Sequence, residues 1–128
     1  MNRRDSKALM ARIDEMLGEA SWLVSHAEAL TDYGRTEADA EWERAALCEE
    51  QVACLLEAAG RIAEAAVHRV SAATCYERQS LAPHAVTLLR AALSTLSPGE
   101  YRSRAETQLV RCLDLARKQL SHVSTIRK

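Results

Sequence analysis

Apolar and small side chains recur in steps of three and four residues between Gly60 and Glu100, and this spacing constrains the fold more than any other feature of the chain. Steps of this size place side chains on one face of a helix. The first run predicts a helix over Ile62–Arg78, and the second predicts a helix over residues 81–96 with Ser80 as its N-cap. We therefore expect two short, closely packed helices in this stretch.

The segment Ser97-Pro98-Gly99-Glu100 carries the signals of another helix start. Ser97 is suited to the N-cap, Pro98 to the first helical position and Glu100 to the reciprocal position of a capping box. The helix that follows is expected over residues 98–122, with a frayed tail from Val123 to Lys128. Its inward face is expected to hold Tyr101, Ala105, Leu109, Cys112, Leu113, Ala116 and Leu120.

Two further helices are expected in the N-terminal half, over residues 6–30 and from residue 36 to Gly60. The first has Asp5 or Ser6 as its cap and carries a heptad seam, a spacing with which two helices bury apolar side chains between them. Gly34 suits the left-handed position after this helix, and the second helix has a capping-box-like start at residue 36. The seam comprises Leu9, Ile13, Met16, Ala20, Leu23, Ala27 and Leu30, and the inward face of the second helix comprises Trp42, Ala45, Ala46, Glu49, Val52, Ala53, Leu56 and Ala59.

Length and composition indicate a single all-α domain over residues 1–128. The chain has no Phe, four Gly and two Pro, which favours helix throughout and leaves little material for sheets. Connections as short as those expected here make consecutive helices antiparallel. About five such helices form either an up-and-down bundle or an α-α array.

Two segments of the chain resemble the tetratricopeptide repeat family, and together they span Trp42 to Pro98. Proteins of this family pack large side chains against small alanines, and a proline begins the next repeat. The two matches are twenty positions apart, whereas the family repeats every ~34 residues, so the helix Ile62–Arg78 would belong to both. The first match comprises Leu56, Gly60, Arg61, Glu64 and Ala65, and the second comprises Tyr76, Ala85, Leu89, Ala92 and Pro98.

The resemblance implies an array of helices with a concave face that binds peptides, and it favours the array for the second to fifth helices. On the first match, Glu50, Cys54 and Glu57 would point into that groove. The Lys and Asn residues with which some members of the family bind a C-terminal carboxylate have no equivalents at these positions. The resemblance therefore implies a basic or apolar peptide as the ligand.

Charge is divided unevenly along the chain. Residues 1–60 carry 6 Lys/Arg and 13 Asp/Glu, a net charge of −7, whereas residues 61–128 carry 11 and 5, a net charge of +6. The acidic region is Glu37 to Glu57, and the basic residues of the last helix are Arg102, Arg104, Arg111, Arg117 and Lys118. The two regions are solvated faces, or they neutralise each other in the fold, or they steer a charged partner or a second copy of the chain.

The best cluster of metal ligands in the sequence is Glu64, His68 and Cys75, which lie at steps of four and seven on one helix face. Cys54 or Cys112 from a neighbouring helix could complete the coordination shell. This cluster is the basis of an alternative prediction, in which the chain is a small helical bundle that binds a metal or cofactor and has enzymatic activity.

Other kinds of chemistry are not indicated. A Cys–His pair could join Cys75 or Cys112 to His68, His84 or His122, but no local feature indicates an activated thiol, and the four cysteines are expected to be reduced. The sequence has no glycine-rich phosphate loop, no run that could span a membrane and no aromatics interleaved with the arginines of the last helix. We expect no cofactor, no membrane or nucleic-acid partner and, by default, a cytoplasmic location.

The sequence thus predicts a non-enzymatic protein–protein interaction module that binds a helix or peptide segment of a protein partner. No catalytic residue is assigned, and the expected partner-binding residues are Glu50, Cys54 and Glu57. A homodimer is a second expectation, because the heptad seam of the first helix and the opposed charges suit a second copy of the chain. In the alternative, the first helix covers the apolar side of the next two helices.

Overall fold

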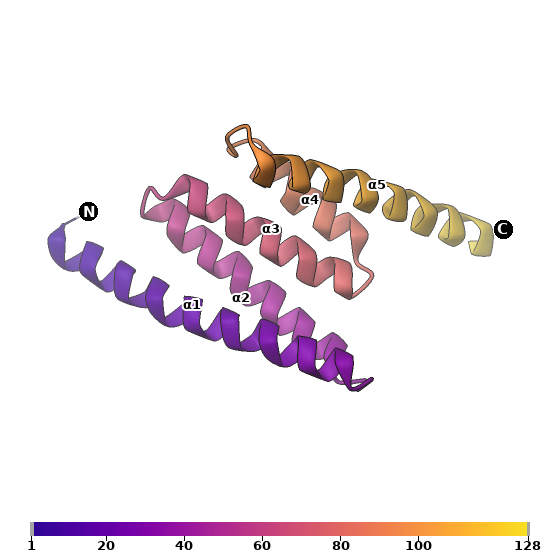
Figure 1. Cartoon of the computed structure of the whole chain (residues 1–128), viewed down its shortest axis with the longest axis horizontal. Helices are drawn as coiled ribbons and strands as arrows, with labels where there is room; N and C mark the ends of the chain where they lie inside the picture. Colours follow the sequence, from indigo (N-terminus) through magenta and orange to yellow (C-terminus); the bar gives the residue numbers. More distant parts are fainter. Residues whose placement is uncertain (1, 128) are drawn as a thin grey trace.

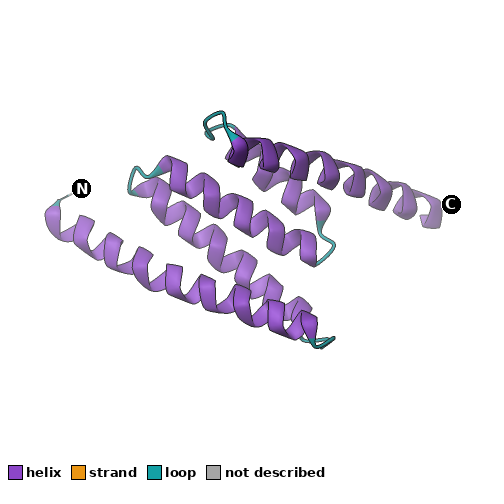
Figure 2. Cartoon of the chain, viewed as in Figure 1, coloured by secondary structure: helices purple, strands orange, loops and turns teal. Residues whose placement is uncertain are grey.

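The chain folds into five helices, and the part of the chain that the structure describes contains no strand. The computed structural model describes residues 2–127, with side chains described as far as Ser121. Figure 2 shows short loops between long helices, so the all-α prediction is confirmed. The helices are α1 (Arg3–Asp32), α2 (Ala38–Ala58), α3 (Ile62–Arg78), α4 (Ala82–Leu93) and α5 (Glu100–Arg127).

The five helices form an open up-and-down array and not a closed bundle. Each helix packs mainly against the helices before and after it in sequence, and α1 and α5 lie at opposite edges of the molecule (Figure 1). Arg61, the N-cap of α3, also contacts Met10 of α1, and Glu77 of α3 contacts Arg111 of α5. Helices α1, α3 and α5 therefore share one layer, and α2 and α4 form the other.

Three contacts between α3 and α5 join residues that are 34 positions apart. The Tyr101 hydroxyl lies 3.5 Å from the carbonyl oxygen of Val67, and Gln108 Nε2 lies 3.0 Å from Thr74 Oγ1. The two helices are therefore parallel and side by side, with the hairpin through α4 as the unit between them. The contact between α1 and α3 joins residues 51 positions apart, so this register is not shared along the whole array.

The core consists mainly of alanine, with a few larger side chains from each helix. The seam of α1 packs against α2 inside the chain, where Cys48 Sγ lies 3.6 Å from the carbonyl oxygen of Met16. The expectation that this seam serves a homodimer is therefore wrong, and the alternative, in which the first helix covers its neighbours, holds. The largest fully buried side chains are Ile13, Leu56, Leu89, Val52, Cys75 and Cys112.

Helix α3 begins and ends where its sequence predicts, but the starts of the other four helices differ. Helix α1 begins earlier because the Asn2 side chain accepts a hydrogen bond of 2.8 Å from the backbone N–H of Asp5, so neither Asp5 nor Ser6 is the cap. Helix α2 begins at Ala38, with Glu37 at the N-cap and no side-chain capping bond. The predicted start at Pro98 is also wrong, because α5 begins at Glu100.

Ser80 does not cap α4 as predicted. It has a φ of 62° and lies at the left-handed position after α3, which glycine normally occupies. The N–H of Leu81 donates to the carbonyl of Tyr76, as the N–H of Arg61 donates to Leu56 after α2. Helix α3 therefore ends in the same hydrogen-bonded motif that α1 and α2 form with Gly34 and Gly60, which have φ values of 66° and 79°.

The last two helices differ in length, and part of the predicted inward face of α5 is exposed. Helix α4 has 12 residues and ends at Leu93 rather than residue 96, whereas α5 has 28 residues and continues to Arg127. The C-terminal half of α5 therefore extends past α4 (Figure 1). Tyr101, Leu113 and Leu120 were expected to face inward but are exposed, whereas Ala105 and Cys112 are buried. Lys128, the end of the predicted tail, lies outside the described residues.

Within residues 2–127, no helix combines the length and the hydropathy needed to cross a bilayer.

Candidate functional site

A groove of about 460 Å³ runs between α1 and α3, with side chains of α2 at its base. We call it the α1/α3 groove. Its walls combine small hydroxyl side chains with the apolar side chains of Leu17 and Val24, and charged groups lie along it. It is lined by Leu17, Ser21, Val24, Ser25 and Glu28 of α1, by Trp42 and Glu49 of α2, and by His68, Ser71, Thr74, Cys75 and Arg78 of α3.

A buried carboxylate lies at the base of the α1/α3 groove. Glu49 is only 6% exposed, and its Oε2 lies 2.7 Å from Nδ1 of His68. A carboxylate taken out of water needs such a partner, because an unpaired buried charge is strongly unfavourable. The pair therefore fixes the orientation of the His68 ring in the groove and joins α2 to α3.

Trp42 connects the three helices at another point along the groove. Its indole N–H donates a hydrogen bond of 2.9 Å to Thr31 Oγ1 at the end of α1, and its ring is buried. The guanidinium carbon of Arg78 lies 5.4 Å from the centre of the ring, within the range of a cation–π contact. This arrangement holds the exposed Arg78 side chain against the groove.

The α1/α3 groove continues toward α5. Thr74 and Arg78 line both this groove and a second cleft that Glu77 and Arg111 complete. Arg111 makes two parallel hydrogen bonds to the Glu77 carboxylate, of 2.6 and 3.0 Å, and these hold the pKa of Glu77 below its ordinary value. One continuous concave surface therefore crosses α1, α3 and α5.

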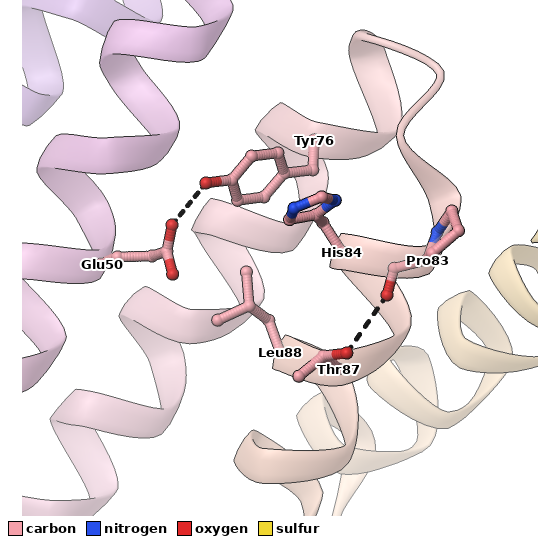
Figure 3. A pocket seen from close by; sticks show the side chains of 6 residues that line it. All are labelled: Glu50, Tyr76, Pro83, His84, Thr87 and Leu88. Carbon is pink, nitrogen blue, oxygen red and sulfur yellow. Dashed lines mark hydrogen bonds between the residues drawn. The ribbon is translucent and has the colours of Figure 1, made fainter.

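The other face of α3 borders a smaller hollow of about 250 Å³ between α2 and α4 (Figure 3). We call it the α2/α4 hollow. The Tyr76 hydroxyl donates a hydrogen bond of 2.5 Å to Glu50, and its ring stacks on His84 with 5.1 Å between ring centres. Burial, followed by the bond to Glu50, raises the pKa of Tyr76, so the phenol stays protonated as the donor. Pro83, Thr87 and Leu88 complete the hollow.

The three residues predicted to bind a partner lie away from the α1/α3 groove. Glu50 lines the α2/α4 hollow, and together with Cys54 it also lines a shallow surface hollow beside Arg12 of α1. Glu57 is exposed and forms an ion pair with Arg69 of α3. The structure thus brings Glu50 and Cys54 together, and places Glu57 in a separate contact.

The predicted metal-ligand cluster of Glu64, His68 and Cys75 does not assemble. Glu64 pairs with Arg61, His68 pairs with Glu49, and Cys75 points into the core. Among the described residues, no three His, Cys, Asp or Glu side chains lie close enough together to hold a metal ion. The side chain of His122, a predicted partner for a thiol, lies outside the described residues.

The cysteines are free in the structure, and three of them are buried. Burial, followed by the charges of nearby carboxylates, raises the pKa of Cys48 and Cys112 to about 11 and that of Cys75 to about 12. A thiol with such a pKa is protonated at neutral pH and is a poor nucleophile. Cys54, on the surface of α2, is the exposed one.

Most charged groups of the acidic region and of α5 pair locally. Glu41 pairs with His26 of α1 and with Arg44, and Glu57 pairs with Arg69. On α5, Asp114 accepts from Arg117 and Lys118 at 3.0 Å each. The ion pairs of the described residues thus join the acidic region to Arg35, Arg44 and Arg69, and the basic residues of α5 to Glu77, Glu106 and Asp114.

The sequence prediction missed the residues that form the α1/α3 groove. Ser21 and Ser25 are four residues apart, and Ser71 and Thr74 are three apart, which places each pair on a polar helix face. That spacing is also typical of an ordinary solvated face. Only the packing of α1 beside α3 brings the two faces together, and no local motif encodes that contact.

No protein-family model, curated protein or solved structure matches the chain, so its own residues and their arrangement are the basis for inferring what it does.

Proposed function

We propose that the protein is a non-enzymatic interaction module that binds a helix or an extended peptide segment of a protein partner in the α1/α3 groove. The observation that carries this proposal is the groove itself, with a volume of about 460 Å³ and walls contributed by two helices. Binding sites in proteins commonly have volumes of ~300–1,000 Å³ and combine apolar walls with a few well-placed polar groups.

The lining of the groove suits a polypeptide ligand. Ser21, Ser25 and Ser71 have short side chains that let a backbone approach closely, and their hydroxyls can donate to or accept from it. Leu17 and Val24 offer apolar contact for side chains of the ligand. Because a helix or strand presents both apolar and polar groups at regular spacing, it can use both kinds of lining.

The resemblance to tetratricopeptide proteins is part of the same proposal. The register of 34 residues between α3 and α5 equals the repeat length of that family and supports a single repeat unit made of α3 and α4. The resemblance implies a concave ligand-binding face. With α3 and α4 as one hairpin, we assign this face to the α1/α3 groove and not to Glu50, Cys54 and Glu57 of α2.

The chemistry of the buried thiols supports a binding role rather than catalysis. The pKa values of Cys48, Cys75 and Cys112 are all raised to about 11 or 12, which removes the thiolate that a nucleophilic mechanism needs. Within the groove, the buried carboxylate of Glu49 is engaged with His68.

The experiment that tests the proposal is selection of a displayed random-peptide library on the full-length chain. The affinities of the selected peptides are then measured for the wild type and for two matched variants. In each variant an arginine replaces a small hydroxyl side chain. Ser71→Arg lies on α3 in the α1/α3 groove, and Thr87→Arg lies on α4 in the α2/α4 hollow. We expect Ser71→Arg to weaken binding at least about tenfold by filling the groove, and Thr87→Arg to leave it unchanged. Equal affinity for both variants, or loss with Thr87→Arg alone, would contradict the proposal.

A further inference from the structure

Helix α5 has an exposed apolar stripe that no part of the described chain covers. Val110 and Leu120 are each 67% exposed and Leu113 is 37% exposed, and Arg117 lies between the last two on the same face. These four residues, which we call the α5 stripe, follow in steps of three, four and three. That is the heptad spacing of a seam along which two helices pack.

The α5 stripe lies at the open edge of the array. Ala105 and Cys112 face the other helices, and the stripe occupies a neighbouring side of α5. Since α4 is shorter than α5 by more than half, it cannot cover the stripe along its length. Figure 1 shows no helix on the outer side of α5.

A hollow on this face has the geometry that receives a side chain from another helix. It is lined by Val110, Leu113, Asp114 and Arg117, together with Arg111. The first four stand at positions i, i+3, i+4 and i+7, which is the set of four residues that forms a hole in knobs-into-holes packing. Such a hole is filled when a second helix supplies the side chain.

We propose that the α5 stripe is a dimer interface, on which α5 of a second copy of this chain packs in the antiparallel direction. When the two-fold axis crosses the stripe at the level of residue 115 along α5, Val110 lies opposite Leu120 of the partner subunit. It also places Leu113 against the aliphatic part of Arg117 of the partner subunit. Every position in the stripe then meets a position of the same stripe, as a symmetric two-fold interface requires.

The charges of α5 favour the antiparallel direction. Within one chain, Asp114 accepts from Arg117 at 3.0 Å, but the Arg117 side chain is 77% exposed and can reach further. In the antiparallel dimer, each Arg117 lies beside Asp114 of the partner subunit, so opposite charges meet twice. A parallel pair would instead bring the two Arg117 side chains together, which is unfavourable.

The size of the stripe indicates a weak dimer. Its four residues cover about three helical turns, which is less than the ~800 Å² per partner of a standard interface. The interface is distinct from the α1/α3 groove. Its test is therefore independent of the proposed peptide-binding function.

The test is sedimentation velocity of the full-length chain between about 5 and 200 µM. We expect a monomer–dimer equilibrium that Leu120→Gln weakens at least about tenfold. The matched control Leu115→Gln, on another side of α5, leaves the equilibrium unchanged. A chain that stays monomeric over the whole range would overturn the proposal, and so would a dimer that Leu120→Gln does not weaken.

A charge exchange tests the direction of packing. Asp114→Arg and Arg117→Asp each place like charges opposite one another in the homodimer, so each is expected to be monomeric, with helicity unchanged by circular dichroism. An equimolar mixture of the two variants restores opposite charges across the interface and is expected to dimerise. A mixture that remains monomeric would contradict the antiparallel arrangement.

Discussion

Nδ1 of His68 on α3 lies 2.7 Å from Oε2 of Glu49 on α2, and Glu49 is almost completely buried at the base of the α1/α3 groove. The pair thus joins two helices at the surface to which we assign ligand binding. Because each group satisfies the other, removal of one partner has a different consequence from removal of both.

His68→Leu is expected to lower the free energy of unfolding by about 2 kcal/mol, because it leaves a buried carboxylate without its partner. The double variant Glu49→Leu with His68→Leu is expected to recover most of that loss, since no unpaired charge remains. Urea unfolding of the wild type, both single variants and the double variant measures the coupling. Additive effects, with a coupling near zero, would show that the contact does not stabilise the fold.

Ser80→Gly is expected to stabilise the protein by about 0.5 kcal/mol. Ser80 has a φ of 62°, and this left-handed conformation is unfavourable for any residue that has a Cβ atom. Glycine avoids that strain, but its greater conformational freedom in the unfolded chain offsets part of the gain. The matched control is Gly60→Ser, which introduces the same strain after α2 and is expected to destabilise. If thermal unfolding shows that Ser80→Gly lowers stability, the left-handed conformation at this position is not strained.

Arg111→Met is expected to lower the free energy of unfolding by about 1 kcal/mol at pH 7 and by much less near pH 3. Arg111 holds the pKa of Glu77 in the folded chain below the ordinary value of 4.5. The ion pair between Arg111 and Glu77 therefore contributes its full stabilisation at pH values above the ordinary pKa of Glu77. This stabilisation is lost as the pH falls through the folded-state pKa of Glu77, because the carboxylate becomes protonated.

Urea unfolding at the two pH values measures this difference. Arg90→Met, at an exposed position on α4, is the control for the loss of a surface cation. An effect of Arg111→Met that is the same at both pH values would exclude the ion pair with Glu77 as its cause.

One thiol of the native protein is expected to react rapidly with Ellman's reagent, and the other three at least about 100-fold more slowly. Cys54 is exposed, whereas Cys48, Cys75 and Cys112 are buried and their raised pKa values keep them protonated. Cys54→Ser should remove the rapid phase, and all four thiols should react after unfolding. A rapid phase that persists in Cys54→Ser would mean that a buried thiol is accessible.

Local sequence signals were sufficient where a helix and its ends depend on nearby residues. The apolar spacing between Gly60 and Arg78 predicts α3 as observed, because Gly60 ends α2 and the spacing continues unbroken. Most of the seam of α1 and of the predicted inward face of α2 is buried, with Leu9, Leu30 and Ala59 partly buried, since a long run of apolar residues leaves one consistent face.

Predictions failed where two local conformations compete, or where the outcome depends on tertiary packing. Ser80 matches the preference for a helix cap, but the hydrogen bond from Leu81 back to Tyr76 places it in the left-handed position instead. Leu113 and Leu120 have the spacing of buried residues, yet they are exposed, whereas Cys112 on the packed side of α5 is buried. Which side of a helix its neighbours cover is not visible in the local pattern.

The candidate binding surface was also beyond local signals. Glu50, Cys54 and Glu57 lie on one face of α2, as their spacing requires, but the α1/α3 groove is formed by α1 and α3 with α2 at its base. Ser21 and Ser71 come from segments 50 residues apart and meet only through tertiary packing. A spacing rule within one helix cannot predict such a pair.

The most direct test of the proposed function is an amide ¹H–¹⁵N titration of the labelled chain with a peptide selected on it. If the peptide binds in the α1/α3 groove, the shifted amides will cluster at Ser21, Ser25, Ser71 and Thr74. The chemical shifts of amides near Thr87, in the α2/α4 hollow, will not change. Shifts centred instead on Glu50 and Thr87 would assign binding to the opposite face and contradict our account.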